Sequence, residues 1–221
     1  MRKEISKDIV GKWLKAWSLS RDLPLPTQYK SGFKVDVGYE TQKSRYVFTE
    51  LNDDFFALAA SINEPWIYLK VCASPLELKN RLPERWIIQQ QGYMMECFPP
   101  MSILNVTLHE NYQLEFDHYD STSVVRIVTK DGELASVGRV VIVDDLAVYD
   151  RISTEENHKR KGLATFLMKE LEKIALSQNV SNHFLVATEQ GRSLYESLGW
   201  KLYSLYISIV IPSETSKIKR N

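Results

Sequence analysis

The sequence predicts a protein of the α/β (α+β) class, with a mixed, mostly antiparallel sheet flanked by helices. Short segments in which apolar and polar residues alternate recur along the chain and are typical of strands. Amphipathic segments with helical spacing lie between some of these strands. Turn signals such as Asp131-Gly132 separate the remaining strands and favour hairpins.

Composition excludes several classes of function. The chain has 221 residues, of which 44% are hydrophobic and 25% charged, which is ordinary for a globular protein. Its 28 basic and 28 acidic residues balance, so no global field favours nucleic acid or a membrane surface, and any affinity for anions must be local. The N-terminus lacks the apolar core of a signal peptide, and no apolar run reaches membrane-spanning length. We expect a cytoplasmic protein with no nucleic-acid or membrane partner.

Cys72 and Cys97 lie in hydrophobic contexts without the spacing of a metal site. We therefore expect two buried free thiols and no metal.

The first half of the chain predicts an initial helix followed by the order strand, strand, helix, strand, helix, strand. Leu23-Pro24-Leu25-Pro26 ends the first helix, Asn52 begins the second, and Ser74-Pro75 opens the third. Because Asp53 and Asp54 make the start of the second helix acidic, we expect no nucleotide there. The predicted segments are residues 5–19, 33–37, 45–48, 52–62, 66–72, 74–82, and 86–88 with 93–95 as one interrupted strand or two short ones.

Phe98-Pro99-Pro100-Met101 reads as a linker, which divides the chain into residues 1–100 and 101–221. A second series of elements follows it, beginning with an antiparallel meander. These are strands at 112–116, 123–128, 134–143 and 146–153, a helix at 163–177, a strand at 183–187, a short helix at 191–198 stopped by Gly199, and a strand at 200–211.

The meander leads into a basic turn, His158-Lys159-Arg160-Lys161-Gly162, which feeds the helix at Leu163. Cations are unfavourable at a helix N-terminus, where unpaired N–H groups and the helix dipole already supply positive charge. An anionic ligand, usually phosphate, would stabilise this arrangement, and Gly162 would let the backbone approach it closely. A solvated basic turn is the alternative that this segment alone leaves open.

Two motifs resemble those of the GNAT superfamily of acyl-CoA-dependent N-acetyltransferases. Lys159-Arg160-Lys161-Gly162-Leu163-Ala164 is similar to the family's pyrophosphate loop, with Lys159 in place of the usual Arg or Gln. Leu194-Tyr195-Glu196-Ser197-Leu198-Gly199-Trp200 is similar to its Leu-Tyr-x-x-Leu-Gly-Phe signature. The resemblance covers roughly residues 104–212.

The resemblance implies an N-acetyltransferase that uses acetyl-CoA on a primary amine of a small molecule or peptide by direct attack. The loop would bind coenzyme A, whose pantetheine arm would lie between residues 151–154 and 184–187, with the thioester carbonyl near Ile152. The implied cofactor-binding residues are Ile152, Ser153, Thr154, Lys159, Arg160, Lys161, Gly162, Leu163, Ala164 and Thr165.

Tyr195 matches the family tyrosine that protonates the leaving thiolate, although a tyrosine packed in the core is the alternative. Asp150 is the candidate general base, with Tyr149 and Glu189 as weaker ones, and a salt bridge explains Asp150 equally well. A non-catalytic acyl-CoA-binding or sensing module is the other function that these residues allow. The chain would be a monomer or a homodimer.

The family usually has two helices between its first two strands, and these shape the acceptor pocket. Asp117 to Thr122 is too short for them, so we expect the first half of the chain to supply that wall. The order of its elements echoes the second half, which predicts a degenerate half-repeat. An Asn that often precedes the tyrosine helix is absent, with Thr188 at about that position and Gly191 in place of a common Ala.

Overall fold

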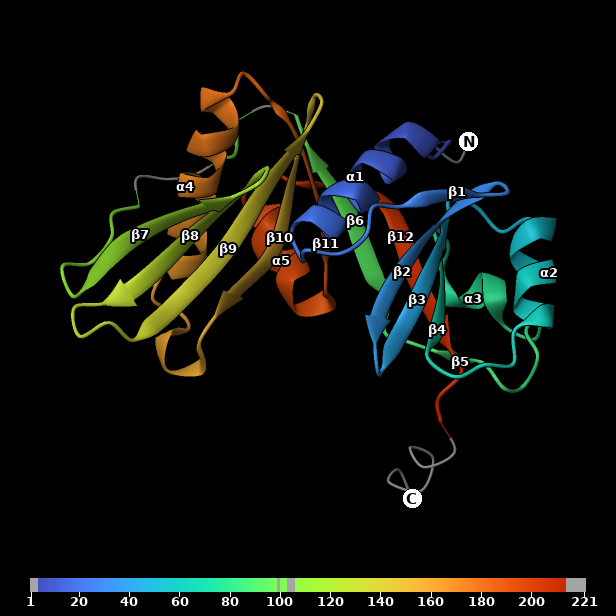
Figure 1. Cartoon of the computed structure of the whole chain (residues 1–221). Coiled ribbons are helices and arrows are strands. Elements are labelled where there is room, and N and C mark those ends of the chain that lie inside the picture. The colour runs from blue at the N-terminus through green and yellow to red at the C-terminus, as the bar shows by residue number, and fades with distance from the viewer. Residues whose placement is uncertain (1–3, 99, 103–105, 214–221) are drawn as a thin grey trace. The chain divides into compact units, whose positions relative to one another are not determined.

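The computed structural model describes residues 4–98, 100–102 and 106–213, which form two compact units (Figure 1). Of the described residues, unit 1 contains 4–11, 23–93 and 204–213, and unit 2 contains 12–22, 94–98, 100–102 and 106–203. The sequence placed a single boundary in the linker around Pro99, which itself lies outside the described residues. Unit 2 includes residues 12–22 from before this linker, and unit 1 includes residues 204–213 from after it.

The sheet of unit 1 has the strand order β1-β2-β3-β4-β12, and β5 also pairs with β12. β2 and β3 are antiparallel, β3 and β4 are parallel, and β12 runs antiparallel to β4. The strands are β1 (Thr27–Tyr29), β2 (Gly32–Tyr39), β3 (Gln42–Phe48), β4 (Ile67–Val71), β5 (Ile87–Ile88) and β12 (Lys201–Val210).

Helix α2 (Asp53–Ser61) connects the parallel strands β3 and β4 and starts as predicted, with the Asn52 side chain accepting from the Phe55 N–H at 3.1 Å. Helix α3 (Pro75–Leu78) is shorter than predicted, since Lys79 leaves the helical conformation and Asn80 has a φ of 62°. The fully buried core of this unit includes Phe48, Phe55, Leu69, Val71, Leu78, Ile207 and Ile209.

The sheet of unit 2 has the order β6-β11-β10-β9-β8-β7. The predicted meander β7–β10 is antiparallel throughout, and β10 then pairs in parallel with β11. The strands are β6 (Gly92–Cys97), β7 (Tyr112–Tyr119), β8 (Thr122–Thr129), β9 (Leu134–Val143), β10 (Leu146–Thr154) and β11 (Asn182–Ala187).

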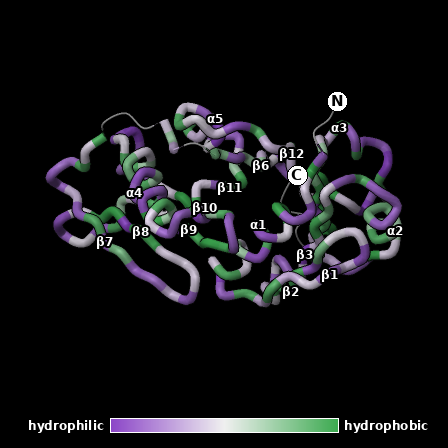
Figure 2. Tube along the Cα trace, turned by 90° about the horizontal axis from the view of Figure 1, so that it is seen from above, coloured by the Kyte–Doolittle hydropathy of each residue, from purple (hydrophilic) through white to green (hydrophobic). Residues whose placement is uncertain are grey.

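Helix α4 (Leu163–Ser177) connects β10 and β11 and packs on β8, β9 and β10. The apolar stripe of α4 supplies buried residues including Leu167 and Leu171. Along the trace of the whole chain, hydrophobic stretches alternate with hydrophilic ones (Figure 2). Helix α5 (Glu189–Ser197) starts before the predicted Gly191, because the Thr188 side chain caps the Gly191 N–H at 3.2 Å. It ends before Gly199, whose φ of +91° fits the predicted stop.

The same pairing pattern occurs in both units. An antiparallel pair, a helical crossover and a parallel pair occur as β2-β3-α2-β4 in unit 1 and as β9-β10-α4-β11 in unit 2. The degenerate half-repeat itself stays a prediction.

Helix α1 (Lys7–Leu19) begins in unit 1 and ends in unit 2. Its apolar side is buried through Val10, Trp13, Leu14 and Trp17. No described helix is both long and apolar enough to cross a membrane. Cys72 and Cys97 are buried free thiols, as predicted, and burial raises the pKa of Cys97 to about 11.

Glu172 of α4 is a buried carboxylate that makes the stability of the fold depend on pH. Burial raises its pKa, and the Met101 N–H, which donates to Oε1 at 2.6 Å, opposes the rise. As pH rises past the ordinary glutamate range of about 4, the unfolded chain releases this proton before the folded protein does, so the free energy of unfolding falls.

We therefore expect Glu172→Gln to gain stability relative to the wild type as pH increases. Urea denaturation at about pH 4 and about pH 8 measures the difference, with Glu115→Gln at an exposed position of β7 as the control. An equal effect of Glu172→Gln at both pH values would contradict this assignment.

Candidate active site

A cavity of about 700 Å³ in unit 2 opens where β10 and β11 separate. The parallel pairing of these strands ends at Tyr149 and Leu185, and β10 continues to Thr154 along the cavity wall. Ligands of α/β sheets bind at the carboxyl ends of parallel strands, which is the position of this cavity.

A β-bulge on β10 creates the separation. Asp150 pairs with Arg139 and Ser153 with Val137, so Arg151 and Ile152 face a single residue of β9, Gly138. Arg151 has a φ of 51°. A Cβ on Gly138 would lie 2.6 Å from Ile152 Cδ1, so the glycine makes room for the side chain that the bulge turns inward.

The basic turn and the start of α4 form another wall. Arg160 and Gly162 have φ values of 60° and 75°, and Gly162 occupies the N-cap position of α4. The left-handed conformation explains the glycine, because a side chain at this φ would be strained.

The N-terminus of α4 has no side-chain cap and no acidic residue in its first turn. The other long helices differ, since Ser6 accepts from the Ile9 N–H in α1, while Asn52 caps α2 and Thr188 caps α5. The first N–H groups of α4 are therefore available to an anion in the cavity.

His158 does not extend the exposed basic run that the sequence suggested. It is buried in a 3-10 turn, where Nδ1 lies 3.0 Å from the Tyr112 hydroxyl and Nε2 lies 3.7 Å from Glu133 Oε1. Lys159, Arg160 and Lys161 are exposed, and Lys159 pairs with Glu156 at 2.5 Å.

Tyr195 projects from α5 into the same cavity and is only 8% exposed. Burial raises its pKa to about 12, and the negative charge of Asp150 adds to the rise. The hydroxyl therefore keeps its proton at neutral pH, which a proton donor requires.

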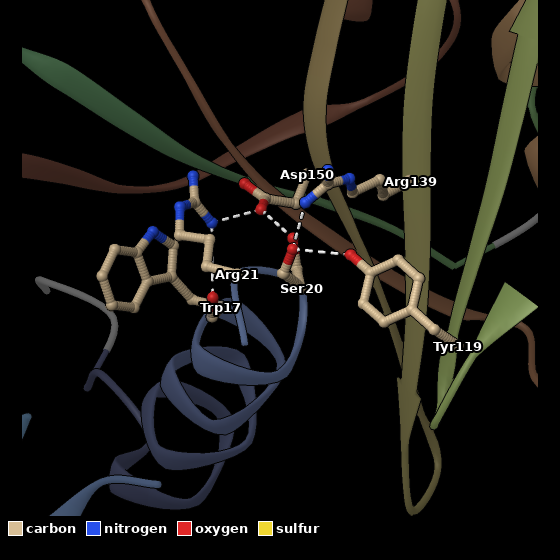
Figure 3. A network of polar contacts seen from close by, with 6 residues as sticks. All are labelled: Trp17, Ser20, Arg21, Tyr119, Arg139 and Asp150. Atoms are coloured by element: carbon tan, nitrogen blue, oxygen red, sulfur yellow. Dashed lines mark hydrogen bonds and ion pairs between the residues drawn. The ribbon is translucent and has the colours of Figure 1, made fainter. Parts of the chain in front are cut away.

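Asp150 belongs to a network of polar contacts at the end of α1 (Figure 3). Its Oδ2 accepts hydrogen bonds from the Ser20 hydroxyl and from Arg21 Nη1. The Ser20 carbonyl accepts from Arg139 Nη1 and, at 2.8 Å, from the Tyr119 hydroxyl. These contacts satisfy a carbonyl at the helix end and fix it to the sheet beside Asp150.

The cavity brings together most of the residues singled out from the sequence. Its lining includes Asp150, Tyr149, Tyr195 and every implied cofactor-binding residue except Lys161. Glu189 does not line it, and on β11 the lining begins at Leu185 because Phe184 packs against Tyr203 with ring centroids 5.3 Å apart.

Sequence reasoning missed two lining residues, Gln190 and Arg21, of which Arg21 comes from the first half of the chain. The sequence predicted that the first half of the chain contributes a wall of the acceptor pocket. For Arg21 itself, the only local signal was a cation just after a helix, where a cation is ordinary. The pairing of Arg21 with Asp150 joins residues far apart in sequence, which no local pattern encodes.

The described residues contain no group of three or more His, Cys, Asp or Glu side chains placed to hold a metal ion. The groups that converge on the cavity are backbone N–H groups, cations, a tyrosine and one carboxylate.

Comparisons with known proteins agree with this geometry. The sequence profile of the acetyltransferase (GNAT) family matches residues 91–200. No curated protein sequence matches the chain.

Several solved structures share the fold at low sequence identity. A GCN5-related N-acetyltransferase from Kribbella flavida is 13% identical with a TM-score of 0.65, and the match covers 97% of this chain and 98% of that one. A GCN5-related N-acetyltransferase-like protein from Streptococcus suis is 13% identical, with coverages of 92% and 97% and a TM-score of 0.59. A tandem GNAT protein from the clavulanic acid biosynthesis pathway is 12% identical, with coverages of 72% and 68% and a TM-score of 0.53.

Proposed function

Because this chain belongs to the acetyltransferase (GNAT) family through its domain at residues 91–200, we propose that it transfers the acetyl group of acetyl-CoA to a primary amine of a small molecule or peptide. The observation that carries the proposal is the convergence of the uncapped N-terminus of α4, the separated strands β10 and β11, and Tyr195 on one cavity.

Acetyl-CoA fits the residues present. The diphosphate would take the free N–H groups at the start of α4, with charge supplied by Lys159 and Arg160. The arm bearing the thioester would follow the lining residues of β10 past the bulge, toward Tyr195. The backbone N–H of Ile152, which lies in the bulge, would donate to the thioester oxygen as negative charge develops there.

Direct transfer is the mechanism we propose. The amine nitrogen attacks the thioester carbon, the C–N bond forms, and the C–S bond breaks with its electron pair on sulfur. Tyr195 gives a proton to the departing thiolate and Asp150 receives one from the amine. The Arg21 cation pairs with Asp150 and so competes with an incoming proton for the carboxylate.

That competition gives a second candidate function, a non-catalytic acyl-CoA-binding module. The two candidates differ in thiol release from acetyl-CoA in the presence of a panel of amines, with acetyl-CoA binding measured separately by calorimetry. Thiol release with any amine supports the transferase. Acetyl-CoA binding without thiol release for every amine would favour the sensing module. Absence of acetyl-CoA binding would contradict both candidate functions.

Arg160→Ala is expected to weaken acetyl-CoA binding about fivefold, because an exposed charge contact contributes up to roughly 1 kcal/mol. Lys161→Ala is the matched control, since Lys161 has the same charge in the same turn but does not line the cavity. Titration at low and high salt would measure both, and the Arg160 effect should shrink as salt increases. Equal losses in the two variants would mean that the turn acts only through its overall charge.

A further inference from the structure

The part of the cavity beside Asp150 contains an ion pair with open hydrogen-bonding positions. Arg21 and Asp150 both line the cavity, and their side chains are 16% and 14% exposed. Oδ2 of Asp150 takes both recorded hydrogen bonds, so Oδ1 receives none from a described residue. Arg21 uses only Nη1, which contacts Asp150 and the Trp17 carbonyl at 3.3 Å.

The remaining donors of Arg21, on Nε and Nη2, have no partner among the described residues. In Figure 3 only one terminal nitrogen of Arg21 takes part in dashed contacts. A guanidinium has five N–H donors in a planar fork, and the free edge of this one has the geometry that binds a carboxylate.

Both groups are held in place before any ligand arrives. The guanidinium carbon lies 4.6 Å from the centre of the Trp17 ring, and Ser20 is anchored through Arg139 and Tyr119. Such preorganisation lowers the entropy lost when a charged ligand binds.

An ion pair whose two members each keep a free edge matches a ligand with adjacent charges of opposite sign. The ammonium of such a ligand would donate to Asp150 Oδ1, and its carboxylate would accept from the free edge of Arg21. An α-amino acid carries these two groups on one carbon, so it can reach both members of a contact ion pair. An amine without a carboxylate would leave the free edge of Arg21 unpaired in a largely buried position.

We propose that the acceptor is a free α-amino acid, held by Arg21 through its carboxylate and by Asp150 through the amino group that is acetylated. This inference rests on the proposed function. Overall, the α-ammonium compound and acetyl-CoA give the N-acetyl amino acid, free coenzyme A and one proton. Arg21 is a specificity-determining residue in this assignment.

The test compares matched acceptors with the full-length protein. Leucine, leucinamide and isoamylamine share one side chain, and phenylalanine, phenylalaninamide and phenethylamine share another. We expect KM for each amide and each decarboxylated amine to be at least about tenfold above that of its amino acid, which is the loss of one charged contact. Equal use of all three members of each set would overturn the inference while leaving the proposed function intact.

The variants Arg21→Lys and Arg21→Gln test whether Arg21 is responsible for the preference for acceptors that carry a carboxylate. Arg21→Lys keeps a cation beside Asp150 and protects folding, but it lacks the planar fork, so the preference for the carboxylate should fall to within about twofold. Arg126→Gln is the control, since it removes an arginine paired with Asp117 at 3.3 Å that does not line the cavity. A purely structural role for Arg21 would leave the ratio between acceptors unchanged in Arg21→Lys.

Binding measured by saturation-transfer NMR with coenzyme A present makes the inference independent of turnover. Leucine should bind at least about tenfold more tightly than leucinamide, as measured by competition. Binding of leucine without thiol release would support the inference and count against the proposed reaction. Failure of leucine to bind, or equal binding of its amide, would overturn the inference.

Discussion

Replacement of Tyr195 by phenylalanine is expected to lower kcat roughly 100- to 10,000-fold, the usual contribution of a positioned general acid. The hydroxyl is the only group lost, and the ring would keep its packing against Trp200, whose centroid lies 6.1 Å away. Acetyl-CoA affinity should therefore change little. Single-turnover thiol release and calorimetric binding would measure the two quantities separately.

The pH profile gives a second measurement of the same role. Since burial and the charge of Asp150 raise the pKa of Tyr195 to about 12, the phenol stays protonated through neutral and moderately alkaline pH. Loss of this acid should lower activity only as pH approaches that value. Tyr203→Phe is the control, because Tyr203 is buried in β12 and does not line the cavity. Full turnover in Tyr195→Phe at every pH would contradict the assignment.

Gly138→Ala is expected to lower the free energy of unfolding by about 2 kcal/mol, within the range for overpacking a core. The new methyl group would lie 2.6 Å from Ile152 Cδ1, 2.9 Å from Leu171 Cδ1 and 3.1 Å from Leu167 Cδ2. These atoms are the ends of side chains, so they move rather than prevent folding. Urea denaturation measures the loss.

A double-mutant cycle shows whether the clash with Ile152 is responsible. Ile152→Val removes Cδ1, the atom nearest to the new methyl group, so the double variant should be more stable than the sum of the single effects predicts. Additive effects would place the strain at the two leucines of α4 instead. Because Ile152 lines the cavity, Gly138→Ala should also weaken acetyl-CoA binding.

Local patterns predicted much of the fold. The bounds of β9 and α4 agree with the sequence because alternation and helical spacing are strong there. The Asn52 cap and the Gly199 stop are encoded by single residues. The sequence overestimated α3 and missed β1, a three-residue strand with little burial, because these depend on short-range backbone geometry and weak pairing.

Local patterns likewise predicted one part of the candidate site and missed another. The residues from Lys159 to Ala164 and Tyr195 lie in contiguous motifs, so the sequence was enough to single them out. Two features were beyond such reasoning. The bulge opposite Gly138 depends on the register of two strands, and the contact between Arg21 and Asp150 spans 129 residues.

Strand β12 has a consequence for how the protein is made. It supplies the antiparallel neighbour of β4, with Ile207 opposite Val71, yet it follows all the strands of unit 2 in the chain. The sheet of unit 1 therefore cannot be completed on the ribosome until the strands of unit 2 and then β12 have emerged, although its other strands appear earlier. During synthesis the edge of β4 is unpaired and can associate with other chains. Chaperone dependence and yield should therefore respond more strongly to changes in β12 than the length of this strand would suggest.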